Sequence, residues 1–306
     1  MIKIITAKNS GFCFGVKRAV EIAQKLSSSV GEKSGMPIYT NGPIIHNPQV
    51  INHLKTRGIT TLEKSDDAFK LKKGILIIRT HGIKKNFTSH LAPSLEVVDA
   101  TCPFVKRAQE IVKKLDTEGR KVIILGDSNH PEVEGLLSYS DKAIVVKNLK
   151  DVKKIPITRN AKIGFLSQTT QSTDTFDEIS RYIKKRNPSA LIYDTICRTT
   201  SERQKEVENI SRKCDIMIIV GGKNSANTRR LAEIARKYTK TYHIETAGEL
   251  SEKWFSTGLS SHKKLNIDVA AGASTPDWII KDVISRIRRL KIFNTKNRIT
   301  KTHPKV

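Results

Sequence analysis

Three cysteines that lie far apart in the sequence stand at the same point of a repeated pattern. Cys13, Cys102 and Cys197 each follow a short apolar segment typical of a strand and precede a segment with apolar residues at helical spacing. After each of these come a strand-like segment that ends in a glycine and a polar loop, then a further helix and a strand that ends in a second polar loop. The sequence therefore predicts three copies of one α/β unit.

The segments of the three copies can be assigned directly. Strands before the cysteines are expected at 2–5, 95–98 and 191–193, and helices after them at 15–26, 103–115 and 200–211. Pro103 suits the first turn of a helix. The glycines that follow the next strands are Gly42, Gly126 and Gly221.

Strands that alternate with helices favour parallel sheets, and ligands bind at the carboxyl ends of such strands. If the three units are arranged about a pseudo-threefold axis, the three cysteines and six polar loops converge on one central site. We expect α/β domains at 14–101 and 102–196, and a third at 197–285 that also includes residues 1–13. Residues 286–306 are expected to form a basic C-terminal tail.

Three cysteines from three units could hold zinc or an iron–sulfur cluster, or they could be buried as small apolar side chains. The sequence has no CxxC pair, which argues against a disulfide framework and a zinc knuckle. A 4Fe–4S cluster fits best, because three cysteine ligands leave the fourth iron open to a substrate oxygen. Cys214 begins an apolar strand-like segment and is predicted to be a core residue.

The polar loops predict an anion site. Hydroxyl, amide and imidazole groups near helix N-termini bind anions well, so a phosphate or diphosphate is the expected ligand. Each residue alone could equally cap a helix or form a turn. Their recurrence at equivalent loops favours the ligand-binding role for His46, His81, His130, Thr169, Thr170, Ser225, Asn227 and Ser274.

A candidate proton donor follows one of these histidines. Glu132 lies two residues after His130, and a carboxyl group in a desolvated site can have a pKa high enough to donate a proton near neutrality. Glu134 is the competing candidate. The sequence has neither GxxxxGK[ST] nor a strand-linked GxGxxG, so no motif supports a nucleotide cofactor.

The formal net charge of +25 attracts nucleic acid, acidic proteins or phosphorylated small molecules. The basic residues are scattered through the expected helices, which is typical of a solvated lysine-rich surface. No run of about 18 apolar residues is present, so no membrane segment is predicted, and a cytoplasmic protein is expected. The aromatic content of 6% does not favour nucleic acid as a partner.

The order of the motifs resembles a known family. The chain is similar, from about residue 2 to 285, to the 4-hydroxy-3-methylbut-2-enyl diphosphate reductase (LytB) family. The motifs that carry the resemblance are GFCFGVKRAV, NGPIIHNPQV, THGI, DATCPFV, GDSNHPEVEG, SQTTQS, DTIC with the later RQ, GGKNSAN and AGASTPDWII. The resemblance implies a trefoil of three α/β domains around one 4Fe–4S cluster with three cysteine ligands, Cys13, Cys102 and Cys197, and one open iron.

The resemblance also implies roles for the polar residues. His46, His81, Ser225, Asn227 and Ser274 match the diphosphate-binding positions, and His130 also lines the substrate pocket. Glu132 matches the proton donor, and Thr169 the threonine that helps position the substrate hydroxyl or its water. Two features depart from the family pattern: Ala226, where a second serine is common, and the basic tail after Asp282.

The implied reaction is a two-electron, two-proton reductive dehydroxylation that gives isopentenyl and dimethylallyl diphosphate plus water, the last step of the non-mevalonate isoprenoid pathway. The open iron is expected to bind the substrate oxygen. Because no flavin or nicotinamide motif is present, electrons are expected from a ferredoxin or flavodoxin. Two alternatives remain at this point: a non-redox hydratase with the same open iron, and a nucleic-acid-binding protein.

Overall fold

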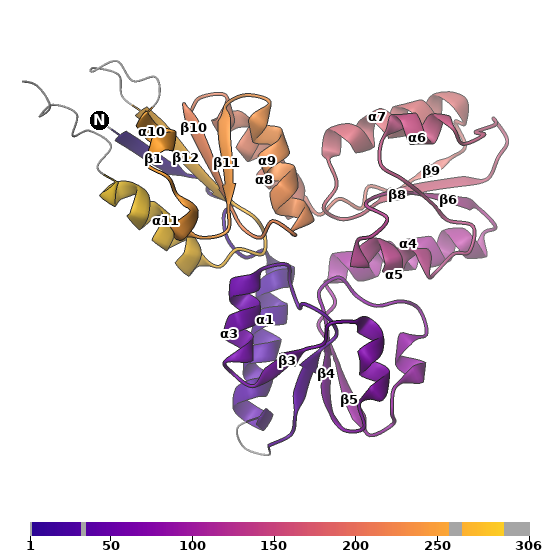
Figure 1. Ribbon diagram of the computed structural model, residues 1–306. Helices are drawn as coiled ribbons and strands as arrows, with labels where there is room; N and C mark the ends of the chain where they lie inside the picture. The colour runs from indigo at the N-terminus through magenta and orange to yellow at the C-terminus, as the bar shows by residue number, and fades with distance from the viewer. Residues whose placement is uncertain (1, 32–34, 257–264, 291–306) are drawn as a thin grey trace, which may run out of the picture.

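The computed structural model describes residues 2–31, 35–256 and 265–290. These residues form three lobes, each built around a four-stranded sheet in which all the strands are parallel (Figure 1). The predicted α/β fold with three repeated parallel sheets is therefore confirmed.

Each lobe combines its sheet with helices. The first lobe contains α1 (Phe14–Leu26), η1 (Ser27–Gly31), β2 (Ile38–Thr40), α3 (Pro48–Lys55), β3 (Ile59–Thr61), η2 (Ser65–Lys70), β4 (Gly74–Ile78), η3 (Phe87–His90) and β5 (Leu95–Asp99). The second contains α4 (Pro103–Thr117), β6 (Lys121–Leu125), α5 (Pro131–Leu137), β7 (Ile144–Val146), α6 (Leu149–Lys153), β8 (Ile163–Ser167), α7 (Thr173–Arg186) and β9 (Leu191–Ile192). The third contains β1 (Ile2–Thr6), α8 (Arg198–Ser211), β10 (Ile216–Val220), α9 (Ala226–Arg236), β11 (Lys240–Ile244), η4 (Ala247–Glu249), α10 (Lys253–Ser256), β12 (Leu265–Ala271) and α11 (Asp277–Arg289).

The three sheets have the same strand order. They run β3-β2-β4-β5, β7-β6-β8-β9 and β11-β10-β12-β1. The N-terminal strand β1 thus pairs with β12 and takes the place that β5 and β9 take in the other sheets. In each sheet the last of these strands leads directly to one of the three repeated cysteines.

This order creates a switch point in the middle of each sheet. In the first two lobes, β2 and β6 lead to neighbours on one side (β3 and β7), and β4 and β8 lead to neighbours on the other side (β5 and β9). In the third lobe, β10 leads to β11 on one side, and the N-terminal strand β1 pairs with β12 on the other. Ligands of parallel sheets bind in the crevice outside the carboxyl ends of such strands. The central pairs are β2 with β4, β6 with β8, and β10 with β12.

Both faces of each sheet are buried. In β10, Ile216, Ile218 and Val220 pack in a cluster with α11, whereas Met217 and Ile219 pack against α8 and α9 on the opposite face. Parallel strands covered on both faces are mainly apolar rather than alternating. Each fully buried isoleucine contributes about 1.5–3 kcal/mol, so the sheets give rigid support to the loops at their ends.

The described part of the chain ends with the C-terminal helix. Helix α11 continues to Arg289, so the first residues of the predicted tail form its last turn, where three arginines suit the helix dipole. Residues 291–306, the rest of that tail, lie outside the described residues. None of the helices in the described ranges is long and apolar enough to cross a membrane.

Candidate active site

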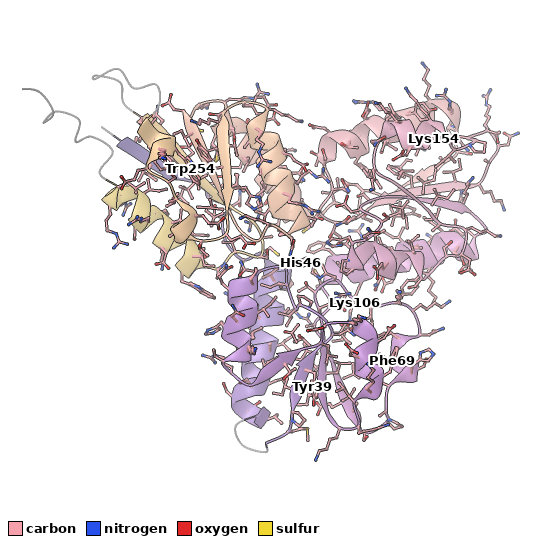
Figure 2. The ribbon with its side chains drawn as sticks, viewed as in Figure 1. Tyr39, His46, Phe69, Lys106, Lys154 and Trp254 are labelled. Carbon is pink, nitrogen blue, oxygen red and sulfur yellow. The ribbon has the colours of Figure 1, made fainter. Side chains whose placement is uncertain are left out.

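A cavity lies where the three lobes meet, and His46 marks this place in Figure 2. It encloses about 720 Å³ of space that opens to solvent. Every predicted site residue lines it: Cys13, His46, His81, Cys102, His130, Glu132, Thr169, Cys197, Ser225, Asn227 and Ser274. The polar ones follow the central strands of the three sheets, as expected for ligand-binding residues at switch points.

The three cysteines hold equivalent local positions. Each is the N-cap residue of a long helix, α1, α4 or α8, and in none of them does the thiol cap the helix. Their backbone N–H groups donate to the second polar loop of the neighbouring sheet. The acceptors are the carbonyl oxygens of Ala273 for Cys13 (3.1 Å), Thr80 for Cys102 (3.0 Å) and Thr169 for Cys197 (2.9 Å). Each lobe thereby fixes the cysteine of the next.

A glycine lets the start of α1 lie against Cys102. A Cβ atom on Gly15 would lie 2.6 Å from Sγ of Cys102, so only a glycine lets the start of α1 lie against this thiol. Burial, with a smaller effect of the Cys13 and Cys197 thiols, raises the pKa of Cys102 to about 11. Burial also raises the pKa of Cys13. Without a metal these two thiols hold their protons, and metal binding releases them.

Three histidines from two lobes cluster in the same cavity. The ring centroids of His46 and His81 lie 4.4 Å apart, and His130 lies 5.5 and 5.2 Å from them. Nε2 of His46 and Nδ1 of His81 are buried without a hydrogen-bond partner. A buried polar atom without a partner is costly, so these nitrogens indicate a polar ligand.

Burial and nearby arginines keep these imidazoles neutral. Burial first, and then the positive charges of Arg79 and Arg229, lower the pKa of His46 to about 4. Burial, His46 and the same two arginines lower the pKa of His130 to about 3. The pKa of His81 is also well below its usual value, mainly through burial and then through the other two histidines. The ligand-free cavity therefore disfavours additional positive charge and favours an anion.

The third lobe contributes a helix N-terminus. Ser225 is the N-cap of α9 and accepts a hydrogen bond from the N–H of Thr228 at 3.3 Å. Ser274 Oγ lies 3.5 Å from Ser225 Oγ and donates to the His46 carbonyl at 3.3 Å. Both polar side-chain atoms of buried Asn227 lack partners. Ala226, in the first turn, lines the same cavity. The orphaned amide and the helix N-terminus fit a diphosphate.

Glu132 is the buried acid of the cavity. It is 1% exposed, in the first turn of α5. Its Oε1 accepts the Thr169 backbone N–H at 2.6 Å, and its Oε2 accepts the Thr169 hydroxyl at 2.9 Å. Burial raises the pKa of Glu132 to about 7, against the lowering effect of these two bonds. Such a group can donate a proton near neutral pH.

Other candidate residues lie elsewhere. Glu134, the competing acid, is exposed on α5 and does not line the cavity. Its negative charge raises the pKa of Arg79. Cys214 lies two residues before β10, is half-buried, and packs with the apolar cluster beneath α8 and α9. Sequence reasoning missed Arg79 and Arg229, whose positive charges lower the pKa values of His46 and His130. Arg79 lies directly between the β4 strand and the THG motif, and this position was the available signal.

The sulfur set suits a group larger than one ion. Among the described residues, one set of three metal-ligand side chains has donor atoms within 4.8 Å of one another, and it is His46, His81 and His130 rather than the cysteines. Three thiols that share a cavity without converging so closely fit a multinuclear group better than a single zinc ion. The neighbouring arginines make the histidine set a poorer place for a cation than for an anion.

Comparison with known proteins gives a consistent result. A family model described as "LytB protein" matches residues 4–288. The 4-hydroxy-3-methylbut-2-enyl diphosphate reductase of Pelobacter propionicus is 43% identical over 97% of this chain and 100% of its own length. The enzyme of the same name from Clostridium perfringens strain 13 is 43% identical over 94% of this chain and 99% of its own.

Two solved structures share the fold. One, described as (E)-4-hydroxy-3-methyl-but-2-enyl diphosphate reductase, the terminal enzyme of the non-mevalonate pathway, is 42% identical over 94% of this chain and 99% of its own, with a TM-score of 0.65. The other, the E-1-hydroxy-2-methyl-but-2-enyl-4-diphosphate reductase of Plasmodium falciparum, is 26% identical over 94% of this chain and 89% of its own, with a TM-score of 0.84. The structure with the lower sequence identity therefore has the higher TM-score.

Proposed function

The chain belongs to the LytB family, and on that premise we propose that its central cavity is the active site of a 4-hydroxy-3-methylbut-2-enyl diphosphate reductase. The enzyme removes the substrate hydroxyl reductively and produces isopentenyl and dimethylallyl diphosphate, the last step of the non-mevalonate isoprenoid pathway. One observation carries the proposal: three thiols, a buried acid and unpartnered anion-binding groups line the same cavity.

LytB proteins are iron–sulfur enzymes, and the cofactor we propose here is one 4Fe–4S cluster held by Cys13, Cys102 and Cys197, with one iron open. Each of these thiols stands at a helix N-terminus, where the helix dipole favours the thiolate form that binds iron. When bound, such a group supplies electrons and a Lewis-acidic iron for the substrate oxygen.

The diphosphate binds to the polar wall of the cavity. His46, His81 and Asn227 offer buried atoms that lack partners, and Ser225 and Ser274 add hydroxyls at the start of α9. A bound diphosphate raises the pKa of the neighbouring imidazoles, because negative charge favours their protonated form. His130 completes this wall. Ala226 has no hydroxyl, and the backbone N–H groups of the helix start provide the donors at its position.

Glu132 holds the proton on a particular oxygen. Oε1 accepts a backbone N–H, which can only donate, so in the acid form the proton resides on Oε2. The bond between Oε2 and the Thr169 hydroxyl, which the carboxylate form accepts, is then reversed. The Thr169 hydroxyl can accept this proton while it donates its own to the substrate side. Glu132 thereby supplies protons through Thr169, which also positions the leaving hydroxyl or its water.

The reaction balances with two electrons and two protons from outside the substrate. The C–O bond breaks, the hydroxyl leaves as water with one proton, and the second proton joins the allylic carbon frame. Water must be kept from the rest of the cavity, and Ile45, Val16 and Val105 form its apolar lining.

The electrons come from a ferredoxin or flavodoxin with an acidic face, and we place its docking surface at the starts of α1 and α4. Phe14 is 65% exposed and Phe104 is 38% exposed, directly beside the cysteine positions. None of the three cysteine-capped helices has an acidic residue in its first turn. Exposed Lys17 on α1 and Arg198 at the start of α8 add basic groups beside two of the cysteines, each with a glutamate partner one turn further along its helix. Aromatic contacts within a basic rim suit a small acidic carrier.

The repeated sheets support domain boundaries at 14–101, 102–196 and 197–285 with 1–13. This division keeps each sheet within one domain and places every cysteine at a junction. The need for reduced thiols and for a low-potential carrier places the reaction in the cytoplasm.

An anaerobic assay tests the proposal. Protein reconstituted with iron and sulfide should convert 4-hydroxy-3-methylbut-2-enyl diphosphate into the two products when dithionite-reduced methyl viologen is present, and only then. Cys102→Ser should abolish the visible absorption of the cluster and the turnover. Conversion without any reductant would instead favour a hydratase.

A further inference from the structure

Arg203 is a buried cation close to the cysteines. It lies on α8, less than two turns after the N-cap Cys197, on the face that also buries Thr200, Gln204 and Val207. Its side chain is almost fully enclosed, since the residue is 4% exposed. Neither the fold nor the proposed proton transfer requires a charge at this position.

The guanidinium joins two segments that shape the site. Its Nη1 donates to the Ala271 carbonyl at 3.0 Å, and its Nη2 donates to the Gly11 carbonyl at 2.7 Å. Ala271 ends β12, before the loop with Ser274, and Gly11 precedes Cys13 by two residues. The third nitrogen of the guanidinium, Nε, is buried without a hydrogen-bond partner. The two neutral carbonyls therefore accept some of the hydrogen bonds that the Arg203 guanidinium can donate, but they do not neutralise its positive charge.

No acidic side chain pairs with Arg203 among the described residues. Of the neighbouring acids on its helix, Glu202 pairs with Arg198 at 2.7 Å, and Glu206 accepts the backbone N–H groups of Lys8 and Asn9 at 2.6 and 2.9 Å. A buried charge without a counter-ion is strongly unfavourable, and such charges are normally paired or lie at an ionic ligand. The fold thus keeps a cation that needs an anion.

Arg203 is held close to two of the cysteines, because it donates to Gly11, two residues before Cys13, and lies on the helix that Cys197 caps. Burial lowers the pKa of Arg203, whereas Cys13, Glu206 and Cys197 raise it, in that order. Conversely, Arg203 lowers the pKa of Cys13. The anion that would compensate Arg203 is consequently the thiolate-bound group on the cysteines.

We propose that Arg203 is the fixed counter-charge of the iron–sulfur group and that it raises the reduction potential of this group. The proposal rests on the proposed function for the presence of the group. In the reduction step, one electron passes from the external carrier to the group, and no bond forms or breaks. The group becomes one charge more negative, so a fixed positive charge nearby stabilises the reduced form more than the oxidised form. Arg203 is accordingly a positioning residue that acts through the cofactor.

Two variants separate its charge from its hydrogen bonds. Arg203→Gln removes the charge and keeps an amide donor for a carbonyl, whereas Arg203→Lys keeps the charge and loses the planar fork. Arg120→Gln is the matched control, because Arg120 pairs with Glu118 at 2.7 Å beyond the far end of α4. Full-length reconstituted proteins are titrated anaerobically without substrate, and the reduced group is followed by EPR.

The Arg203→Gln variant should shift the one-electron equilibrium at least tenfold toward the oxidised form, a potential lower by about 59 mV. The Arg203→Lys and Arg120→Gln variants should titrate close to wild type. An unchanged Arg203→Gln variant, or equal shifts in the two Arg203 variants, would overturn the proposal. If Arg203→Gln loses its iron and sulfide, loss confined to that variant supports the counter-charge, and equal loss from Arg203→Lys refutes it.

The test of Arg203 can be told apart from the test of the proposed reductase function. A wild-type protein that holds the group and titrates, yet fails to convert the diphosphate, contradicts the proposed function and leaves the Arg203 effect measurable. A wild-type protein that takes up no iron and sulfide contradicts both.

Discussion

Glu132 and Thr169 form a two-point contact in which each carboxylate oxygen accepts a different donor of the same residue. The N–H of Thr169 lies 2.6 Å from Oε1 and its hydroxyl 2.9 Å from Oε2. The contact joins the start of α5, which follows β6, to the loop after β8, and β6 and β8 are the two central strands of one sheet. It positions a fully buried acid whose pKa is raised to about 7, and the first two predictions follow from it.

Glu132→Gln should bind substrate and turn over at least about 100-fold more slowly, because the amide keeps the shape and one acceptor but cannot donate an acid proton. Steady-state turnover with reduced methyl viologen, together with binding measured without reductant, checks this. Glu134→Gln, on the same helix but exposed, is the control and should retain activity. Wild-type turnover by the Glu132→Gln variant would exclude the acid role.

The same burial predicts a pH effect on stability. The pKa of Glu132 rises from 4.5 in the unfolded chain to about 7 in the fold. Its contribution is therefore fully present below pH 4.5 and is lost as the pH rises through 7, by up to about 3 kcal/mol. Denaturant unfolding of the apoprotein should show that Glu132→Gln gains stability relative to wild type between pH 5 and 8. Parallel pH profiles for the two proteins would contradict this.

Diphosphate binding should take up protons at pH 7. In the ligand-free cavity the pKa of His46 is about 4 and that of His130 about 3, and the bound anion raises both. Affinity should thus fall as pH rises between the free and bound pKa values. Calorimetry in buffers with different heats of ionisation measures the uptake directly. The number of protons taken up should decrease in the His46→Gln variant. In the Ser225→Ala variant the proton uptake should persist, although the diphosphate binds more weakly. Buffer-independent heats would argue against protonation.

Gly15→Ala should lower the iron and sulfide content. Its Cβ would meet Cys102 Sγ at 2.6 Å and Cys102 Cβ at 3.3 Å, so the start of α1 must move away from this cysteine. Gly248→Ala is a matched control, because the nearest atom to its new Cβ is 3.6 Å away. Iron and sulfide analysis after anaerobic gel filtration checks the prediction, and equal loading of the two variants would count against it.

Phe14→Ala should slow reduction by an acidic carrier protein about fivefold and leave reduction by dithionite unchanged, since only the docking contact is removed. The effect should shrink as ionic strength screens the basic rim. Met36→Ala removes an exposed apolar side chain before the amino end of β2, away from the cysteines, and should change neither rate. A loss with dithionite as well would point to damage at the cluster rather than at docking.

The sequence alone was sufficient for the repeated plan. The apolar segment before each cysteine and the helical spacing after it are local signals, and Pro103 lies at the start of α4 as expected. Glycines and polar loops then mark the carboxyl ends of the strands. Because parallel sheets place those ends together, the residues that line the cavity could be named in advance, from the repeats and from the family motifs.

Only the tertiary structure decided which distant groups act on one another and with what charge. β1 pairs with β12 across almost the whole chain, and Arg203 reaches Gly11, 192 positions away. The neutral histidines, the raised pKa of Glu132, and the lack of an acidic partner for Arg203 among the described residues all depend on burial and on distant neighbours. Desolvation and long-range contacts are properties of the packed chain, so no local pattern around these residues encodes them.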